Sequence, residues 1–454
     1  MEEEISRKES EADLLRIAGI TESEIQEAKL QQVINNYYGK RELAVEFLKI
    51  QPLYYDNSRM WWYWNKDNFK WAITDEVNVL NLVNKLTSAN TIMSKEKSEI
   101  LEALRQEARL NAPKEIKKTW IQFKDKIVDI ETGEQIEASS KYFVTNPIPF
   151  QLHPDKFINT PTMDKIFEEW VGKEYVKTLY EIIAYCCLPD YPLNLIFCFI
   201  GSGLNGKSKF LELITKFIGR ENCASTELDI LLNSRFELTR LYKKLICIMG
   251  ETNFNEIKKS SILKKLTGGD LIGFEYKNKD LINDYNYAKV LISTNNLPTT
   301  DDKSIGFYRR WFILDFPNQF TEKKDILKDI PEEEYECLAT KCCLILKDIL
   351  INREFHKQGS IDDRKERFEA KSDFLQKFID ENINKDNLNQ WITKADFHKK
   401  FSEWCKENHF REMAENTLGR KMKEKGFEET RKYVDWLFNG KGGQLRVWLD
   451  ITWK

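Results

Sequence analysis

One eight-residue stretch constrains what this chain can fold into more than any other feature. Residues 201–208 read GSGLNGKS, follow the apolar run LIFCFI at 195–200 and precede a helical pattern at 210–218. The string matches the phosphate-binding motif GxxxxGK[ST], and strand, loop and helix occur in the order that this motif requires. The stretch therefore predicts an α/β core of the P-loop type.

The residue types of this loop suit a nucleotide and a divalent cation. Its glycines let the backbone curl so that amide N–H groups point at phosphate oxygens, and the start of the following helix adds its dipole. Lys207 is expected to neutralise the β and γ phosphates, and Ser208 to ligate Mg²⁺. A glycine-rich turn with a solvated lysine is the simpler alternative. The residues predicted to bind ATP are Gly201, Ser202, Gly203, Leu204, Asn205, Gly206, Lys207 and Ser208.

Two more apolar runs end in polar residues further along the chain. The run LICIMG at 245–250 is followed by Glu251, whose carboxylate can polarise the attacking water and help to hold the metal. The run AKVLIS at 288–293 leads to Asn295, and an amide at such a strand tip can hydrogen-bond the γ-phosphate or the lytic water. Many strands end in Glu, so the interpretation of Glu251 depends on its order and distance from the loop.

An arginine pair follows the third run. Arg309 and Arg310 stand in the string YRRW, before another apolar run. An arginine placed directly after the core is a candidate finger that acts on the ATP of a neighbouring subunit. The alternative is a surface pair that forms salt bridges, and the sequence does not choose between the two arginines.

These strings together resemble a known family. GSGLNGKS, the strand that ends in Glu251, LTGGD at 266–270, STNNLP at 293–298 and RRW at 309–311 stand in that order, before an apolar strand and Phe316. The set resembles the superfamily 3 helicases, in particular the primase–helicases of poxviruses, phages and plasmids. The resemblance is strong within residues 201–316 and weaker over residues 40–155 and the tail.

The resemblance implies an AAA+ type fold, a hexameric ring and ATP-driven movement on single-stranded DNA in the 3′ to 5′ direction. It also implies roles for single residues: Lys207 as loop lysine, Ser208 as metal hydroxyl, Glu251 as strand-end acid, Asn295 as sensing amide, and Arg309 or Arg310 as finger. One position departs from the pattern, because many related ATPases have two adjacent acids where this chain has Gly250 and Glu251. Glu251 is then expected to act as base, while Ser208, the phosphates and water hold most of the Mg²⁺.

The segment between Asp270 and Ala288 corresponds to the region that bears a DNA-binding hairpin in this family. Residues 272–279 read IGFEYKNK. Two aromatic side chains there could stack on bases and two lysines could meet phosphates. Strand alternation separates the lysines from the aromatics, and a turn near Lys277 would bring both to the tip. An ordinary exposed loop is the alternative. The predicted DNA contacts are Phe274, Tyr276, Lys277 and Lys279.

Four regions are expected along the chain: a mainly helical N-terminal domain at 1–155, the ATPase core at 156–320, a helical connector at 321–369 and a winged-helix domain at 370–454. The N-terminal region holds a cluster of aromatic residues: Trp61, Trp62, Tyr63, Trp64 and Trp71. Such a cluster favours the core of a small domain, and a base-stacking surface is the alternative.

The tail has the order helix, helix, helix and two strands, with a hairpin signal at Asn439 and Gly440. This order suits a winged helix that contacts duplex DNA or a partner protein. The third helix carries four cations, Arg420, Lys421, Lys423 and Lys425, and Lys441 would lie at the tip of the wing. Nearby glutamates dilute this charge, so a solvated helix face is the alternative.

The composition of the chain limits which other classes of protein it can belong to. Of the 454 residues, 41% are hydrophobic and 31% are charged, which is typical of a soluble protein with two or three domains. With no apolar signal core and no membrane-length run near the motifs, we expect the cytoplasm of a host cell and no membrane. The nine cysteines form no CxxC pair and the histidines number only four, so disulfides and zinc are not expected. The net charge of −3 shows no global basic field, although a ring can hide basic residues in its channel.

The expected function is that of an ATP- and Mg²⁺-dependent replicative DNA helicase of a virus, phage or plasmid. It would act as a homo-oligomer on single-stranded and forked DNA. The chain contains no Asp-x-Asp pair of the kind common in primases, so a separate primase or other replication proteins are expected as partners. The alternatives are an origin-melting or initiator ATPase without processive unwinding, a P-loop phosphotransferase that acts on a small molecule, and a catalytically inactive ring.

Overall fold

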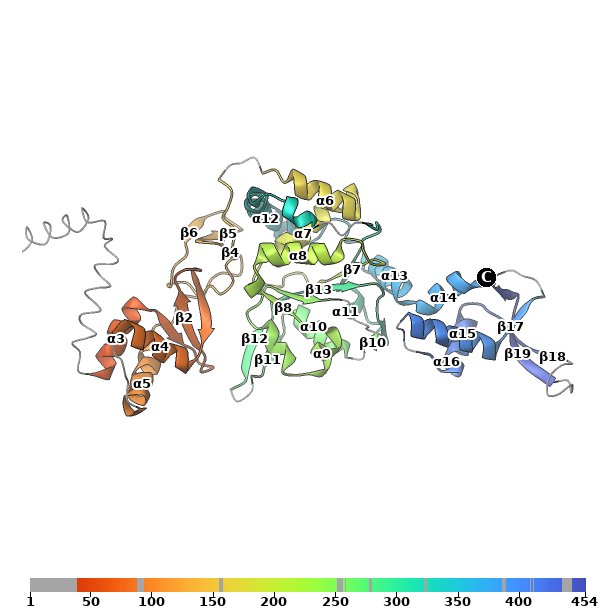
Figure 1. The fold of residues 1–454 in the computed structure, drawn as a ribbon, viewed down its shortest axis with the longest axis horizontal. Coiled ribbons are helices and arrows are strands. Elements are labelled where there is room, and N and C mark those ends of the chain that lie inside the picture. The colour runs from red at the N-terminus through yellow and green to blue at the C-terminus, as the bar shows by residue number, and fades with distance from the viewer. Residues whose placement is uncertain are drawn as a thin grey trace, which may run out of the picture.

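The computed structural model describes residues 39–87, 94–154, 158–250, 256, 257, 259–276, 280–321, 325–385, 389–408, 410, 412–434 and 443–454. Several sequence predictions fall outside these residues: those for Glu251, Lys277, Lys279, the turn at Asn439 and Gly440, and Lys441. Along the long axis, Figure 1 shows an N-terminal part, a central layered body and a C-terminal part. Among the described helices, none has the length and apolar character to cross a membrane.

The central body is built on a parallel five-stranded sheet, which confirms an α/β core. The strand order is β15-β7-β13-β9-β8. The strands are β7 (Ile196–Ile200), β8 (Cys223–Ser225), β9 (Ile246–Met249), β13 (Lys289–Thr294) and β15 (Trp311–Asp315). Every residue of β7 and β13 is buried, because these strands lie inside the sheet and helices cover both of its faces.

Alternate residues of the sheet pack into two hydrophobic layers. Phe197 and Phe199 of β7 join a cluster formed with the helices on one face. Ile196 and Cys198 point to the other face and join a second cluster. The first layer contains residues of α6 (Pro161–Val171), α7 (Val176–Cys186), α8 (Lys207–Ile218) and α12 (Glu332–Asn352). The second layer contains residues of α9 (Leu228–Asn233), α10 (Ser260–Gly268) and α11 (Ile305–Tyr308).

The described N-terminal part contains strands in addition to the helices that the sequence predicts. Helices α3 (Lys40–Ile50), α4 (Glu76–Thr87) and α5 (Ser94–Leu110) alternate with two three-stranded antiparallel sheets. The strands are β1 (Leu53–Tyr55), β2 (Trp61–Asn65), β3 (Lys70–Thr74), β4 (Trp120–Phe123), β5 (Lys126–Asp129) and β6 (Gln135–Glu137). Large aromatic side chains favour a pleated surface over a helix, which explains the strands at the tryptophan cluster.

The tryptophans of that cluster are core residues. Trp61, Trp62, Trp64 and Trp71 are all buried, with exposed fractions of at most 7%. The Trp64 and Trp71 rings meet edge to face, with centroids 5.9 Å apart. The structure thus favours the packing interpretation over a base-stacking surface.

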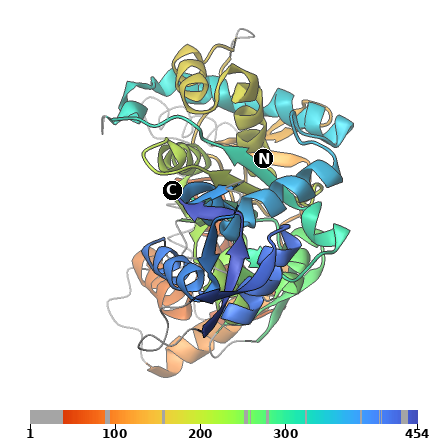
Figure 2. The same cartoon turned by 90° about the vertical axis from the view of Figure 1, so that its right-hand side faces the viewer.

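The residues that follow α13 (Ile361–Ser372) form a hydrophobic core of their own. Figure 2 shows this tail in blue, in front of the central body. The expected helices occur as α14 (Phe374–Asn382), α15 (Lys394–Glu407) and α16 (Glu415–Glu424), and the expected strand pair as β18 (Glu429–Val434) and β19 (Gly443–Leu449). The short strands β16 (Ile383–Lys385), β17 (Trp391–Thr393) and β20 (Ile451–Trp453) were not predicted. Phe378, Phe397 and Phe401 are completely buried in this core, as their helical spacing predicts.

Candidate nucleotide site and DNA interface

The loop between β7 and α8 has a backbone shape that needs its glycines. Gly203 and Gly206 have φ angles of 98° and 92°. A Cβ atom at Gly206 would lie 2.4 Å from Cδ1 of Trp170, and one at Gly201 would lie 2.7 Å from the Phe316 carbonyl oxygen. Larger residues at these positions would therefore displace their neighbours or strain the loop.

Lys207 occupies the centre of this loop. Its side chain is buried, and Nζ donates to the Gly201 carbonyl oxygen at 2.5 Å, to Asn205 Oδ1 at 3.1 Å and to Asn295 Oδ1 at 3.3 Å. Asn205 is also buried and donates from Nδ2 to the Phe316 carbonyl oxygen at 3.2 Å. The ammonium group is thus held among oxygen atoms of the loop and of Asn295.

The other polar residues of the loop face outward. Ser208 is exposed in the first turn of α8, next to Lys207. Ser202 is exposed and accepts a hydrogen bond from Gln319 at 2.8 Å. Leu204 is 65% exposed and has a φ angle of 49°. The exposed Ser208 hydroxyl is accessible to a metal ion bound beside the loop.

Strand register explains why Asn295 lies beside the loop. Thr294 pairs with Ile200, so the residues that follow β13 and β7 leave the sheet side by side. Asn295 is exposed at this edge and accepts from Lys207. Met249 pairs with Ile292, so β9 ends at the same edge. Glu251 comes two residues after Met249, outside the described residues.

The structure distinguishes the two arginines that the sequence could not. Arg310 is 6% exposed and donates to Thr267 Oγ1 at 2.8 Å, to the Lys264 carbonyl oxygen at 3.1 Å and to the Gly306 carbonyl oxygen. Burial lowers the pKa of Arg310, and the charge of Arg309 adds to this effect. Arg310 therefore holds α10 and α11 to the start of β15.

Arg309 has the opposite environment. Its side chain is exposed, while its carbonyl oxygen accepts a hydrogen bond from Arg364 of α13 at 2.6 Å. The backbone is thus fixed and the guanidinium group extends into solvent. This combination suits a residue that reaches another molecule.

The segment after α10 forms an antiparallel hairpin of β11 (Leu271–Phe274) and β12 (Ile282–Tyr285). Phe274 is completely buried, with its ring centroid 5.1 Å from that of Tyr242, so it has no free face on which a base could stack. Tyr276 is half-buried and also contacts Tyr242. The prediction of Phe274 as a stacking residue is therefore corrected, because its alternating face packs into the core.

The residues that this hairpin exposes were not predicted. Leu271, which is 59% exposed, faces Tyr285, which is 53% exposed, across the strand pair. The Lys118 ammonium group lies 5.9 Å from the Tyr285 ring centroid. Only the pairing register could reveal this surface, because the sequence does not say which face of the hairpin packs inward.

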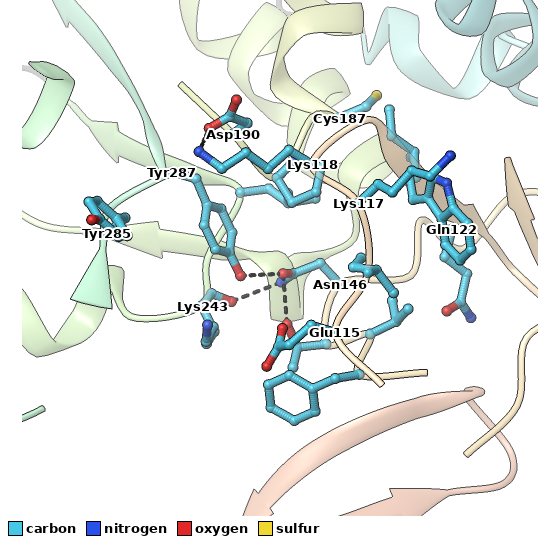
Figure 3. A pocket seen from close by; sticks show the side chains of 18 of the residues that line it. Glu115, Lys117, Lys118, Gln122, Asn146, Cys187, Asp190, Lys243, Tyr285 and Tyr287 are labelled. Atoms are coloured by element: carbon cyan, nitrogen blue, oxygen red, sulfur yellow. Dashed lines mark hydrogen bonds and ion pairs between the residues drawn. The ribbon is translucent and has the colours of Figure 1, made fainter. Parts of the chain in front are cut away.

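A cavity of about 240 Å³ separates the N-terminal part from the base of this hairpin. In Figure 3, Asn146 lies at its wall, where it accepts from Tyr287 at 2.8 Å and donates to the Lys243 carbonyl oxygen at 2.8 Å. The Lys243 ammonium group binds Asp284 of β12 at 2.8 Å. Burial alone would lower the pKa of Lys243, but Tyr287 and Asp284 outweigh it, so the pKa lies above its usual range.

Replacing Lys243 by methionine is expected to lower the free energy of unfolding by about 1–3 kcal/mol, because Asp284 is left without its cation. The loss of stability is smaller than for a fully buried pair, since the side chains of Lys243 and Asp284 are 21% and 28% exposed. Urea unfolding of Lys243→Met, Asp284→Asn and the double variant measures the coupling. Strictly additive single effects would contradict a direct interaction.

Comparison with known proteins finds similarities for the N-terminal part and for the central body. Residues 31–173 match a family described as D5 N terminal like, and residues 199–310 match a family of unknown function, DUF5906. The chain is 24% identical over 276 residues to a candidate helicase of Acanthamoeba polyphaga mimivirus, which covers 54% of this chain and 28% of that protein. It is 26% identical over 172 residues to Primase D5 of Fowlpox virus (strain NVSL), which covers 35% of this chain and 21% of that protein.

Each alignment spans less than a third of the viral relative. Among solved structures, the apo structure of the NrS-1 C terminal region matches with a TM-score of 0.46 at 12% identity, over 91% of this chain and 100% of that chain. An A form of the same region matches with a TM-score of 0.44 at 14% identity, over 89% and 98%. Over residues 31–173 the chain is thus similar to the D5 N terminal like family, and over part of its length it is similar to the two viral proteins named as helicase and primase.

Proposed function

We propose that this protein is an ATP-driven DNA helicase of the superfamily 3 type that acts in the replication of a virus, phage or plasmid. The observation that carries the proposal is the position of Lys207, held between the phosphate-binding loop and Asn295 at 3.3 Å. A cation and a sensing amide at one sheet edge form a site that can respond to the γ-phosphate. The names of the two viral relatives support the replication role.

The residues present fit ATP with Mg²⁺. The loop curls at Gly203 and Gly206, and α8 begins directly behind it, so amide groups and the helix dipole suit phosphate oxygens. Lys207 would bind the β and γ phosphates, and the exposed Ser208 hydroxyl would hold the metal. When bound, the metal neutralises charge on the transferred phosphoryl group. Asn295 would orient the attacking water.

Glu251→Gln is expected to leave ATP binding intact and slow hydrolysis by about a hundredfold or more, because the amide keeps the size of the side chain and removes the base. Binding of a fluorescent ATP analogue and phosphate release measure the two effects separately. Weaker nucleotide binding in place of slow turnover would indicate that Glu251 mainly holds the metal.

We further propose a ring, with six subunits as the expected number, in which Arg309 reaches the nucleotide of a neighbour. The exposure of Arg309 and the internal contacts of Arg310 support Arg309 as the finger. The β11–β12 hairpin would meet single-stranded DNA in the channel, and Lys277 and Lys279 remain the proposed phosphate contacts there. The 3′ to 5′ direction rests on the family resemblance.

The tail elements support the proposal that residues 370–454 form a winged-helix domain. Three helices are followed by the strand pair β18 and β19, and β17 joins β19 at its other side. Such domains contact DNA or partner proteins beside the motor that they serve. All residues proposed for the nucleotide site lie outside this region.

Strand displacement tests the helicase proposal directly. Purified protein with ATP and Mg²⁺ should separate a forked duplex, hydrolyse ATP faster with single-stranded DNA, and assemble into a ring by mass measurement. DNA-stimulated hydrolysis with no strand displacement would support the alternative, an initiator ATPase that melts or remodels an origin. An ATPase rate unaffected by DNA would contradict both.

A further inference from the structure

The two strands at the end of the tail place two arginines directly opposite each other. β18 and β19 pair antiparallel, with Arg431 facing Arg446 and Tyr433 facing Gln444. Both arginines are exposed, and Tyr433 is 65% exposed. Because alternate residues of a strand share a face, the two guanidinium groups and the phenol ring lie on one side of the pair. Figure 1 shows β18 and β19 at one end of the molecule's long axis.

This arrangement is unfavourable within the protein itself. Like charges directly opposite each other on an antiparallel pair repel and destabilise it. Among the described residues, neither Arg431 nor Arg446 has an ion pair or a side-chain hydrogen bond, so no carboxylate there offsets the repulsion. A pair of this kind is explained most simply by an anion that both groups bind together.

The neighbouring helix has a different charge balance. Of the four cations in and directly after α16 that the sequence favoured for DNA binding, three have carboxylate partners: Arg420 with Glu424 at 3.8 Å, Lys423 with Glu429 at 2.9 Å, and Lys425 with Asp373. The β18–β19 pair keeps a surplus of positive charge. Glu429 is the one carboxylate among the residues of these two strands, and it already pairs with two lysines, Lys394 and Lys423. Three strand cations therefore remain for a ligand: Arg431, Lys432 and Arg446.

We propose that the exposed end of the β18–β19 pair binds the phosphate backbone of DNA through Arg431 and Arg446, with the Tyr433 hydroxyl as a further donor. Guanidinium groups form paired hydrogen bonds with phosphate oxygens, which suits two arginines side by side. Contacts of this type position a protein on DNA without reading its sequence. The choice of DNA as the polyanion rests on the proposed function, whereas the anion site rests on the strand geometry alone.

The test compares the full-length Arg431→Gln/Arg446→Gln variant with Lys377→Gln/Lys399→Gln, which removes the same charge from exposed positions on α14 and α15. Fluorescence anisotropy with a short labelled duplex and with the matching single strand, over a range of salt concentrations, measures binding. For the arginine variant we expect at least about tenfold weaker binding at low salt and a salt dependence shallower by about two phosphate contacts. Arg431→Lys/Arg446→Lys should keep most of the salt dependence.

Each outcome decides the proposal. The proposal is supported if Arg431→Gln/Arg446→Gln loses more DNA affinity than Lys377→Gln/Lys399→Gln does. Comparing the duplex with the single strand shows which form of DNA is bound. Equal loss in both variants would mean general electrostatics, and unchanged binding would mean that the face serves another ligand, such as an acidic protein; both results overturn it. The melting temperature by circular dichroism should not fall, since both side chains are exposed and their removal relieves the repulsion between them. If the wild type binds DNA through this face but shows no ATPase activity, the proposed function fails while this inference stands.

Discussion

Lys207→Ala is expected to reduce ATP turnover by about a hundredfold to a thousandfold or more, because the transferred phosphoryl group loses its fixed cation. Lys207→Met keeps more of the side-chain volume and separates loss of charge from loss of packing around this buried residue. Steady-state phosphate release with and without single-stranded DNA measures the effect.

The matched control is Lys209→Ala, one residue past the end of the motif. Lys209 lies on the same helix, but its ammonium group is bound by Glu212 at 2.8 Å and Asp325 at 3.0 Å at the surface. This variant should retain turnover within about twofold, since exposed ion pairs contribute little. Wild-type turnover in Lys207→Ala protein, with Lys209→Ala also active, would refute the nucleotide site.

Arg309→Ala is expected to lower ATP turnover by about a thousandfold, the smallest effect found for arginine fingers, without changing nucleotide affinity or stability. Arg310→Ala should instead lower the free energy of unfolding by several kcal/mol, because the buried Thr267 and the partly buried carbonyl groups of Lys264 and Gly306 lose their donor. Thermal unfolding and turnover of the two variants separate these roles.

Mixing subunits tests whether the site is shared. Arg309→Ala subunits have an intact phosphate-binding loop, and Lys207→Ala subunits have an intact arginine. A mixed ring should therefore regain part of the lost activity at interfaces that combine the two intact halves. No rescue, together with a monomeric mass in the presence of nucleotide, would show that Arg309 does not act between subunits.

Local patterns were sufficient to predict the glycine-rich loop between β7 and α8 and the strands around it. The run LIFCFI and the string GSGLNGKS specify β7 and α8, because an apolar strand followed by a glycine-rich loop and a helix has a strong local signal. The positions of Lys207 and Asn295 also followed from order along the chain. Their contact at 3.3 Å depends on the register of Thr294 with Ile200, which sequence order alone does not supply.

Features set by tertiary packing could not be predicted. The alternation of Phe274 and Tyr276 on one face was expected, but only Tyr242 on the opposing segment shows that this face turns inward. Likewise, Arg309 and Arg310 are equivalent in the sequence and differ only in what surrounds them. The tryptophan-rich strands β2 and β3 were missed because their nearly continuous apolar character conceals the period of two.

Asn295 and the β11–β12 hairpin belong to one short piece of chain. β12 ends at Tyr285, β13 begins at Lys289, and Asn295 follows directly after β13. Lys289 is completely buried, its Nζ donates to the Leu188 carbonyl oxygen, and burial lowers its pKa to about 8. An extended strand is stiff along its axis, and each of its residues advances by about 3.3 Å. The six residues of β13 therefore span about 20 Å, and this one buried strand connects the hairpin to the sheet edge at which Asn295 accepts a hydrogen bond from Lys207.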